Sequence, residues 1–178
     1  MRNSFYRAVP FLFLLFLTGC YDVPYLLRPE AEGIFYEEAL GDWKSIRQTK
    51  QSRTITLSIQ RESSEANWYS IKKVDYPTEE VRFLRAIVHK IGNDLILSYQ
   101  DNTSSDFSIF RVMIDSSVTP AQLKATALSE GAPRFATSEQ LVEFLRSPQS
   151  ERWFQDGYLF SRVETSAGPS EDASLPAK

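Results

Sequence analysis

Apolar and polar side chains alternate along much of the chain between residues 33 and 115. In the clearest stretch, 53–60, Ile55, Leu57 and Ile59 fall on one side, and threonine, serine and glutamine fall on the other. A period of two with many β-branched residues is typical of a β-strand. Further strands are predicted at 33–36, 68–74, 81–90, 95–100 and 107–114.

Turn residues separate these predicted strands. Gly92 and Asn93 stand between two of them, and the all-polar stretch 101–105 stands between the next two. Short strands joined by tight turns favour an antiparallel meander, which either closes into a barrel or folds as a sandwich.

The spacing of apolar residues becomes helical in the last third of the chain. Thr119, Pro120 and Gln122 match an N-cap, a first-turn proline and a capping-box glutamine, which predicts a helix that ends near Gly131.

A second helix is predicted from Thr137 or Ser138. Leu141, Phe144 and Leu145 would form its apolar stripe, and the helix would end at Ser147 and Pro148, before a last strand at 158–163. The expected fold is a mainly β (α+β) domain over 33–164, with two C-terminal helices before the last strand.

An apolar run near the N-terminus predicts export. Arg2 and Arg7 precede the run 11–17, which is shorter than the roughly 20 apolar residues that a membrane span needs. The run ends in Leu17-Thr18-Gly19-Cys20, which holds the only cysteine of the chain.

This tetrad resembles a bacterial lipobox. The resemblance implies that 1–19 is a lipoprotein signal peptide and that Cys20 carries a diacylglyceryl thioether, so that acyl chains hold the protein to a membrane. Residues 20–32, interrupted by Pro24 and Pro29, would form a tether. In lipoproteins of enterobacterial type an aspartate directly after the cysteine favours the inner membrane, so the resemblance, with Tyr21 at that position, implies the outer membrane facing the periplasm over the inner membrane.

Composition narrows the classes of partner. The formal net charge is −3 and becomes two units more negative without Arg2 and Arg7. An acidic chain without a basic cluster argues against nucleic acid as a partner. Twelve Phe, eight Tyr and three Trp can supply a core without disulfides. Residues 165–178, rich in Ser, Pro and Ala, are expected to be a disordered tail.

The sequence Gly41-Asp42-Trp43 resembles the Gly-x-Trp opening of lipocalins and related (calycin-like) β-barrels. In that family the tryptophan closes one end of the barrel against an arginine of the last strand, and here that position is Arg162. A guanidinium over an indole ring gains a cation–π contact. The resemblance therefore implies a lipocalin-like barrel closed by a structural pair, Trp43 and Arg162.

A broader resemblance is to uncharacterised bacterial lipoproteins. It rests on this opening, on segments 83–86 and 107–114, and on the late helical motif at 137–145. It supports the fold and implies no known activity.

Few residues suggest catalysis. His89 is the only histidine, so a His-dependent triad or a His/Cys metal site would lack partners. The acid pairs Glu37-Glu38 and Glu79-Glu80 are adjacent in sequence and would point apart, and the loop 101–106 is better explained as a polar turn than as a calcium site. We expect no catalytic residue, metal or cofactor.

The sequence is compatible with two main functions, and a hydrolase of the cell envelope is a third, least favoured alternative. The first is a non-catalytic structural or interaction module of the cell envelope, bound to the membrane and to an envelope protein. The alternative is a barrel that binds a small apolar ligand. Inward-pointing Phe83, Tyr99, Phe107 and Phe110 would fill the barrel, whereas outward-pointing ones would leave room for a cavity.

Overall fold

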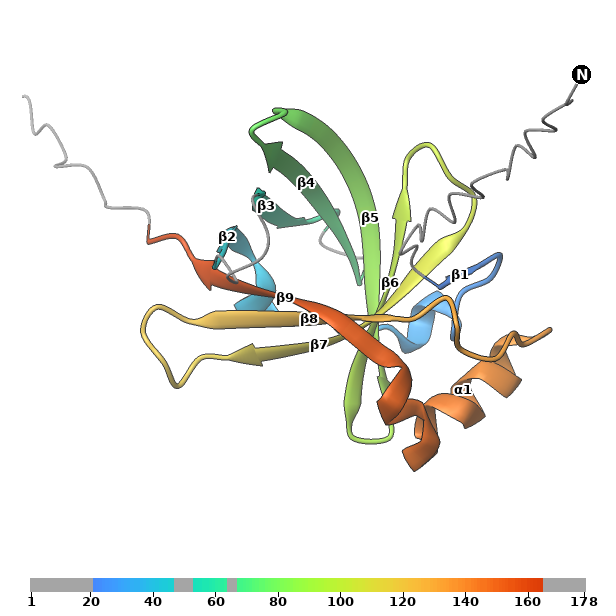
Figure 1. Cartoon of the computed structure of the whole chain (residues 1–178). Helices are drawn as coiled ribbons and strands as arrows, with labels where there is room; N and C mark the ends of the chain where they lie inside the picture. Colours follow the sequence, from blue (N-terminus) through green and yellow to red (C-terminus); the bar gives the residue numbers. More distant parts are fainter. Residues whose placement is uncertain (1–20, 47–52, 64–66, 165–178) are drawn as a thin grey trace, which may run out of the picture.

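The computed structural model describes residues 21–46, 53–63 and 67–164. The lipobox, Cys20 and the predicted tail 165–178 therefore lie outside the described residues. In the described chain, eight strands form a closed antiparallel barrel (Figure 1). They are β2 (Gly41–Ser45), β3 (Thr54–Arg61), β4 (Trp68–Tyr76), β5 (Glu80–Ile91), β6 (Asp94–Asp101), β7 (Phe107–Asp115), β8 (Gln122–Leu128) and β9 (Phe154–Arg162).

Each strand pairs with its neighbour in sequence, and β9 returns to β2 to close the barrel. This is the meander that the alternating pattern predicted. The five strands predicted between 53 and 114 are confirmed as β3 to β7. Segment 33–36 is not a strand, because only Ile34 forms an isolated bridge, to Val88.

The helix predicted from Thr119 to Gly131 is wrong, because Gln122–Leu128 forms strand β8. Leu123, Ala125 and Ala127 also fit a period of two, and β8 lies between β7 and β9. Ladder hydrogen bonds on both edges outweigh a capping signal worth about 1 kcal/mol. A single α-helix therefore stands before the last strand in the described chain.

That helix, α1 (Ser138–Arg146), matches the second prediction. Thr137 is its N-cap, whose side chain accepts a hydrogen bond from the Gln140 amide, and Leu141, Val142 and Leu145 are buried. A 3-10 helix, η3 (Pro148–Trp153), leads into β9. No helix among the described residues has the length and apolarity to cross a membrane.

The core has two parts, one inside the barrel and one outside it. The outer part joins Ile91, Ile96 and Ile109 of β5 to β7 to α1 and to an N-terminal segment containing Tyr21 and Leu27. That segment includes β1 (Asp22–Val23), which pairs with the start of β7, and the 3-10 helices η1 (Glu30–Glu32) and η2 (Glu37–Ala39).

The expected tether over 20–32 is therefore wrong for residues 21–32. Tyr21, Val23 and Leu27 are buried because the apolar outer faces of β5 to β7 need a cover. The folded domain therefore includes residues 21–32 as well as the predicted range from residue 33.

Candidate functional site

One end of the barrel is closed by Trp43 and Arg162. The two residues are register partners on β2 and β9, and the guanidinium lies 5.0 Å from the centroid of the indole ring. Trp43 is fully buried, and its Nε1 donates to the carbonyl of Ala39 over 2.9 Å. Arg162 donates to the carbonyls of Glu38 and Leu40. The pair thereby fastens η2 across this end of the barrel.

Aromatic residues continue the closure beside this pair. The backbone amide of Tyr36 donates to the Tyr69 hydroxyl over 2.6 Å, and Phe35 stacks on Tyr69 with ring centroids 5.1 Å apart. The guanidinium of Arg61 lies over the Phe35 ring, 4.2 Å from its centroid. Burial raises the pKa of Tyr69, so its hydroxyl stays protonated at neutral pH.

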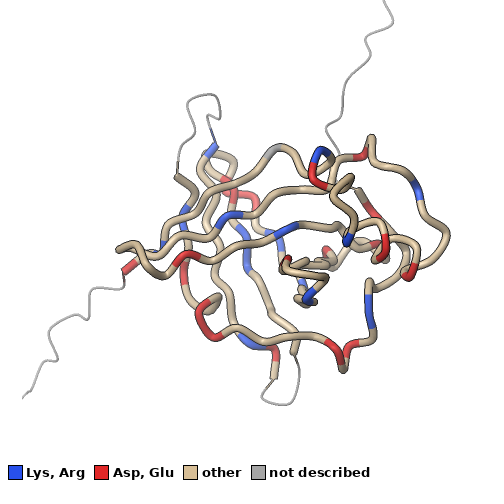
Figure 2. The backbone as a smooth tube through the Cα atoms, turned by 90° about the horizontal axis from the view of Figure 1, so that it is seen from below, with Lys and Arg blue, Asp and Glu red and all other residues tan. Residues whose placement is uncertain are grey.

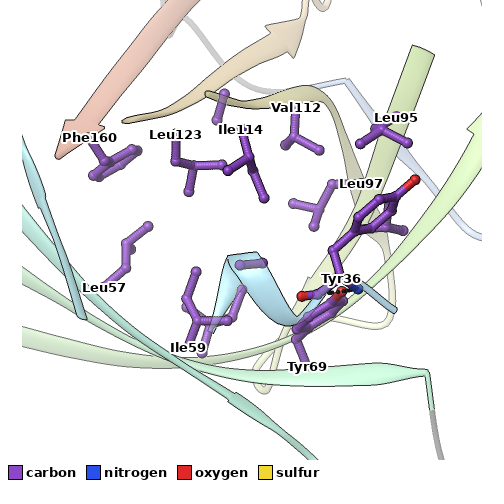
Figure 3. Close-up of a pocket in the computed structure, with 14 residues that line it drawn as sticks. Tyr36, Leu57, Ile59, Tyr69, Leu95, Leu97, Val112, Ile114, Leu123 and Phe160 are labelled. Carbon is purple, nitrogen blue, oxygen red and sulfur yellow. Dashed lines mark hydrogen bonds between the residues drawn. The ribbon is translucent and has the colours of Figure 1, made fainter. Parts of the chain in front are cut away.

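A cavity of about 90 Å³ lies inside the barrel (Figure 3). Its walls are aliphatic except for three aromatic rings. Figure 3 shows Leu57 and Ile59 on one side and Val112, Ile114 and Leu123 on the other, with open space between them. The lining residues are Tyr36, Ala39, Leu57, Ile59, Tyr69, Ile71, Val88, Leu95, Leu97, Val112, Ile114, Leu123, Ala125 and Phe160.

The size of this cavity limits what it can hold. Pockets for drug-sized ligands measure about 300–1,000 Å³, and an engineered cavity of about 150 Å³ admits benzene. The interior is therefore filled for most of its volume, with room left for a narrow apolar group.

Orientation of four aromatic residues explains this intermediate filling. Tyr99 and Phe110 point inwards and pack with ring centroids 5.4 Å apart. Phe83 points outwards and is 53% exposed, and Phe107 packs in the outer core. Two of the four candidate fillers are thus outside the barrel.

A polar depression of about 310 Å³ occupies the other end, between β4–β5 and the β6–β7 loop. Lys73 pairs with Asp75 at 3.0 Å, and Arg82 pairs with Glu80 at 2.6 Å. The Thr103 amide donates to Asp101 and lowers the pKa of that carboxyl.

The floor of this depression includes Leu84 and Tyr99. With Phe110 against Tyr99, these residues separate the polar mouth from the apolar cavity. The alternation along β4 and β5 contains a signal for this polar mouth. Lys73 and Arg82 stand at inward-pointing positions of the alternation, where the other strands carry apolar residues. Sequence reasoning missed both.

The remaining candidates do not assemble into a site. Glu37 and Glu38 lie in the exposed η2, and Glu79 and Glu80 lie at the exposed β4–β5 turn. Within the described residues, no group of three or more His, Cys, Asp or Glu is arranged to hold a metal ion.

His89 is buried in the described structure. Its Nε2 lies 3.4 Å from the carbonyl of Pro29, so the ring packs under the N-terminal segment outside the barrel. Burial lowers its pKa below the ordinary value of 6.5.

Acidic and basic residues are interspersed around the described barrel (Figure 2). The molecule is thus a closed eight-stranded antiparallel barrel, consistent with a lipocalin-like fold, with an apolar interior and a charged mouth. Comparison of the chain with protein-family profiles, with curated proteins and with solved structures gave no match.

Proposed function

We propose that this protein is a lipid-anchored module of the bacterial cell envelope that acts through its outer surface, as a structural or interaction protein without catalysis. The observation that carries the proposal is the contrast between interior and exterior. The barrel retains only about 90 Å³ of free interior, whereas Val81 and Phe83, on one outer face of β5, are about half exposed. Unpartnered apolar surface marks contact sites in folded proteins.

The proposed anchor is an acylated Cys20, generated after removal of residues 1–19. Two acyl chains hold a protein to a membrane stably, since each buried methylene contributes about 0.8 kcal/mol. The proposed location is the outer membrane, facing the periplasm. The interspersed charges support a lipid or protein partner over nucleic acid.

A second candidate function is binding of an apolar group inside the barrel. The specific support is the lining, which offers no ionised group, and the Tyr69 hydroxyl is already engaged by the Tyr36 amide. A single alkyl chain is the chemistry that such a narrow, apolar space accepts.

Native mass measurement of the protein extracted from its own membrane tests both candidates. We expect the mass of residues 20–178 plus acyl chains, together with a protein partner that dissociates under activation. A bound small lipid instead of a partner would favour the second candidate. The matched control is Cys20→Ser, which should lack the acyl mass and leave the membrane fraction. A full-length chain with a free Cys20 thiol would overturn the anchor.

A further inference from the structure

The first described residue is held firmly to the barrel. The Tyr21 amide donates to the Leu128 carbonyl over 3.1 Å, and its hydroxyl donates to the Pro133 carbonyl over 2.8 Å. Arg134 lies over the ring at 4.6 Å and donates to the Asp22 carbonyl. Tyr21 is fully buried, so its position is fixed relative to the body of the protein.

Cys20 directly precedes this fixed residue in the sequence. Consecutive Cα atoms lie about 3.8 Å apart, so no flexible linker separates an acylated Cys20 from the folded domain. The bilayer must then lie against the surface near Tyr21, and the orientation of the barrel is restricted.

Asp22 shows which end of the barrel is near the anchor. Its side chain lines the polar depression together with Lys73 of β4 and Arg82 of β5, and it accepts a hydrogen bond from Ser108 at the start of β7. The β4–β5 hairpin projects at this end, at the top of Figure 1, beside the β6–β7 loop.

The projecting hairpin carries apolar side chains on its outer face. Tyr76, Val81 and Phe83 are 41%, 45% and 53% exposed. Val81 and Phe83 are alternate residues of β5, and Val81 is the register partner of Val74, two residues before Tyr76 on β4. The three side chains therefore share one face of the hairpin.

Charge near this face is balanced. Lys72 is the register partner of Phe83 and shares this face, and Glu79 lies in the exposed β4–β5 turn. Arg85, two residues after Phe83 on the same face of β5, pairs with Glu62 at 2.8 Å. A face with two aromatic rings and no net charge suits the interface of a zwitterionic lipid layer, where Tyr and other amphipathic side chains concentrate.

Resting on the proposed anchor at Cys20, we propose that the outer face of the β4–β5 hairpin (Tyr76, Val81 and Phe83) is a second membrane contact. It lies in the headgroup and upper acyl region of the same bilayer that receives the acyl chains. Because the covalent anchor already holds the protein at the bilayer, the effective concentration of lipid at the patch is high. The patch therefore contacts the membrane even though it would bind too weakly on its own.

An introduced cysteine tests the contact, because Cys20 is the only cysteine in the chain and is blocked once acylated. The acylated Phe83→Cys variant is labelled at the new cysteine with an environment-sensitive fluorophore and reconstituted into phosphatidylcholine vesicles. Met113→Cys is the matched control, since Met113 is 57% exposed on the outer face of β7 towards its other end. Val81→Cys provides a second site on the hairpin.

Nitroxide-bearing phospholipid should quench the labels at 83 and 81 roughly twofold or more, as expected for side chains in the interfacial layer, and leave the label at 113 unchanged. Equal quenching at 83 and 113, or none at 83 in protein that floats with the vesicles, would overturn the hairpin contact. If the residue at position 83 is protected from labelling in native membranes but not in these vesicles, a protein covers this face. That outcome would also overturn the proposed lipid contact.

The outcome for the anchor is read separately. Unaltered protein that reacts with thiol reagent and fails to float with vesicles would refute acylation at Cys20. Floating protein with an unquenched label at 83 would refute only the hairpin contact.

Discussion

At the scale of single residues, Trp43 connects three parts of the molecule. Its ring lies under Arg162 of the last strand, and its Nε1 binds the residue that ends η2. One side chain thus links the first barrel strand, the closing strand and the segment that covers this end. Gly-x-Trp identified Trp43 from sequence because a short motif encodes a specific local contact.

We predict that Trp43→Ala lowers the free energy of unfolding by about 3–5 kcal/mol, since a fully buried indole is replaced by a cavity. Urea denaturation followed by circular dichroism measures the change. Phe83→Ala is the matched control: its ring is half exposed, and we expect a change of at most about 0.5 kcal/mol. Equal losses in the two variants would contradict the closing role of Trp43.

His89 predicts a dependence of stability on pH. Its pKa is lowered in the folded protein by burial, and within the described residues its Nδ1 has no hydrogen-bond partner. Below pH 6.5 the unfolded chain therefore binds a proton at His89 more readily than the folded protein does. The free energy of unfolding is at its full value above this pH and falls as the pH is lowered.

The measurement is the midpoint of thermal unfolding between about pH 7.5 and 5.5, a range in which histidine is the side chain that ordinarily titrates. The chain has a single histidine, so His89→Gln should flatten the profile. An unchanged slope in that variant would show that other groups cause the dependence.

At the scale of elements, the N-terminal segment behaves as part of the domain. Its docking requires close approach to β5: a Cβ atom on Gly33 would lie 2.6 Å from Cδ1 of Ile87, which is itself fully buried. Pro24 and Pro29 suggested a tether because they prevent regular structure, but irregular chain can still bury side chains.

We predict that Gly33→Ala destabilises the protein by about 1–3 kcal/mol, since the added methyl group would lie too close both to the buried Ile87 side chain and to the Glu30 carbonyl oxygen. Chemical denaturation measures the loss, and hydrogen exchange should locate the loosened contacts in 21–34. Ala31→Ser, at an exposed position of the same segment, serves as the control. A loss no larger than that of Ala31→Ser would refute tight docking of this segment.

β8 and α1 show the limits of local signals. Each of them follows a threonine that matches an N-cap, Thr119 before β8 and Thr137 before α1. Only Thr137 caps a helix, since Leu141, Val142 and Leu145 meet the outer core. Segment 122–128 occupies the gap between β7 and β9, where a strand satisfies the backbone groups of both neighbours.

At the scale of the whole molecule, closure of the barrel sets the proposed functions. Closure leaves a narrow apolar cavity inside, a polar mouth at one end and an apolar hairpin face outside. The cavity suits one alkyl chain at most, and the hairpin lies near the residue that follows the proposed lipidated cysteine. Both proposals therefore place this protein in contact with lipid, by different surfaces.

The sequence by itself determined β3 to β7, the alternating apolar face of β3, and α1, and its resemblance to lipocalins pointed to Trp43. These features depend on alternation, spacing or a short motif, which act over a few neighbouring residues or repeat along the chain. Only the tertiary structure decided that 122–128 is a strand, that Tyr21 is buried and that the cavity is small. Each of these depends on partners far away in sequence, whose hydrogen bonds and packing outweigh local preference.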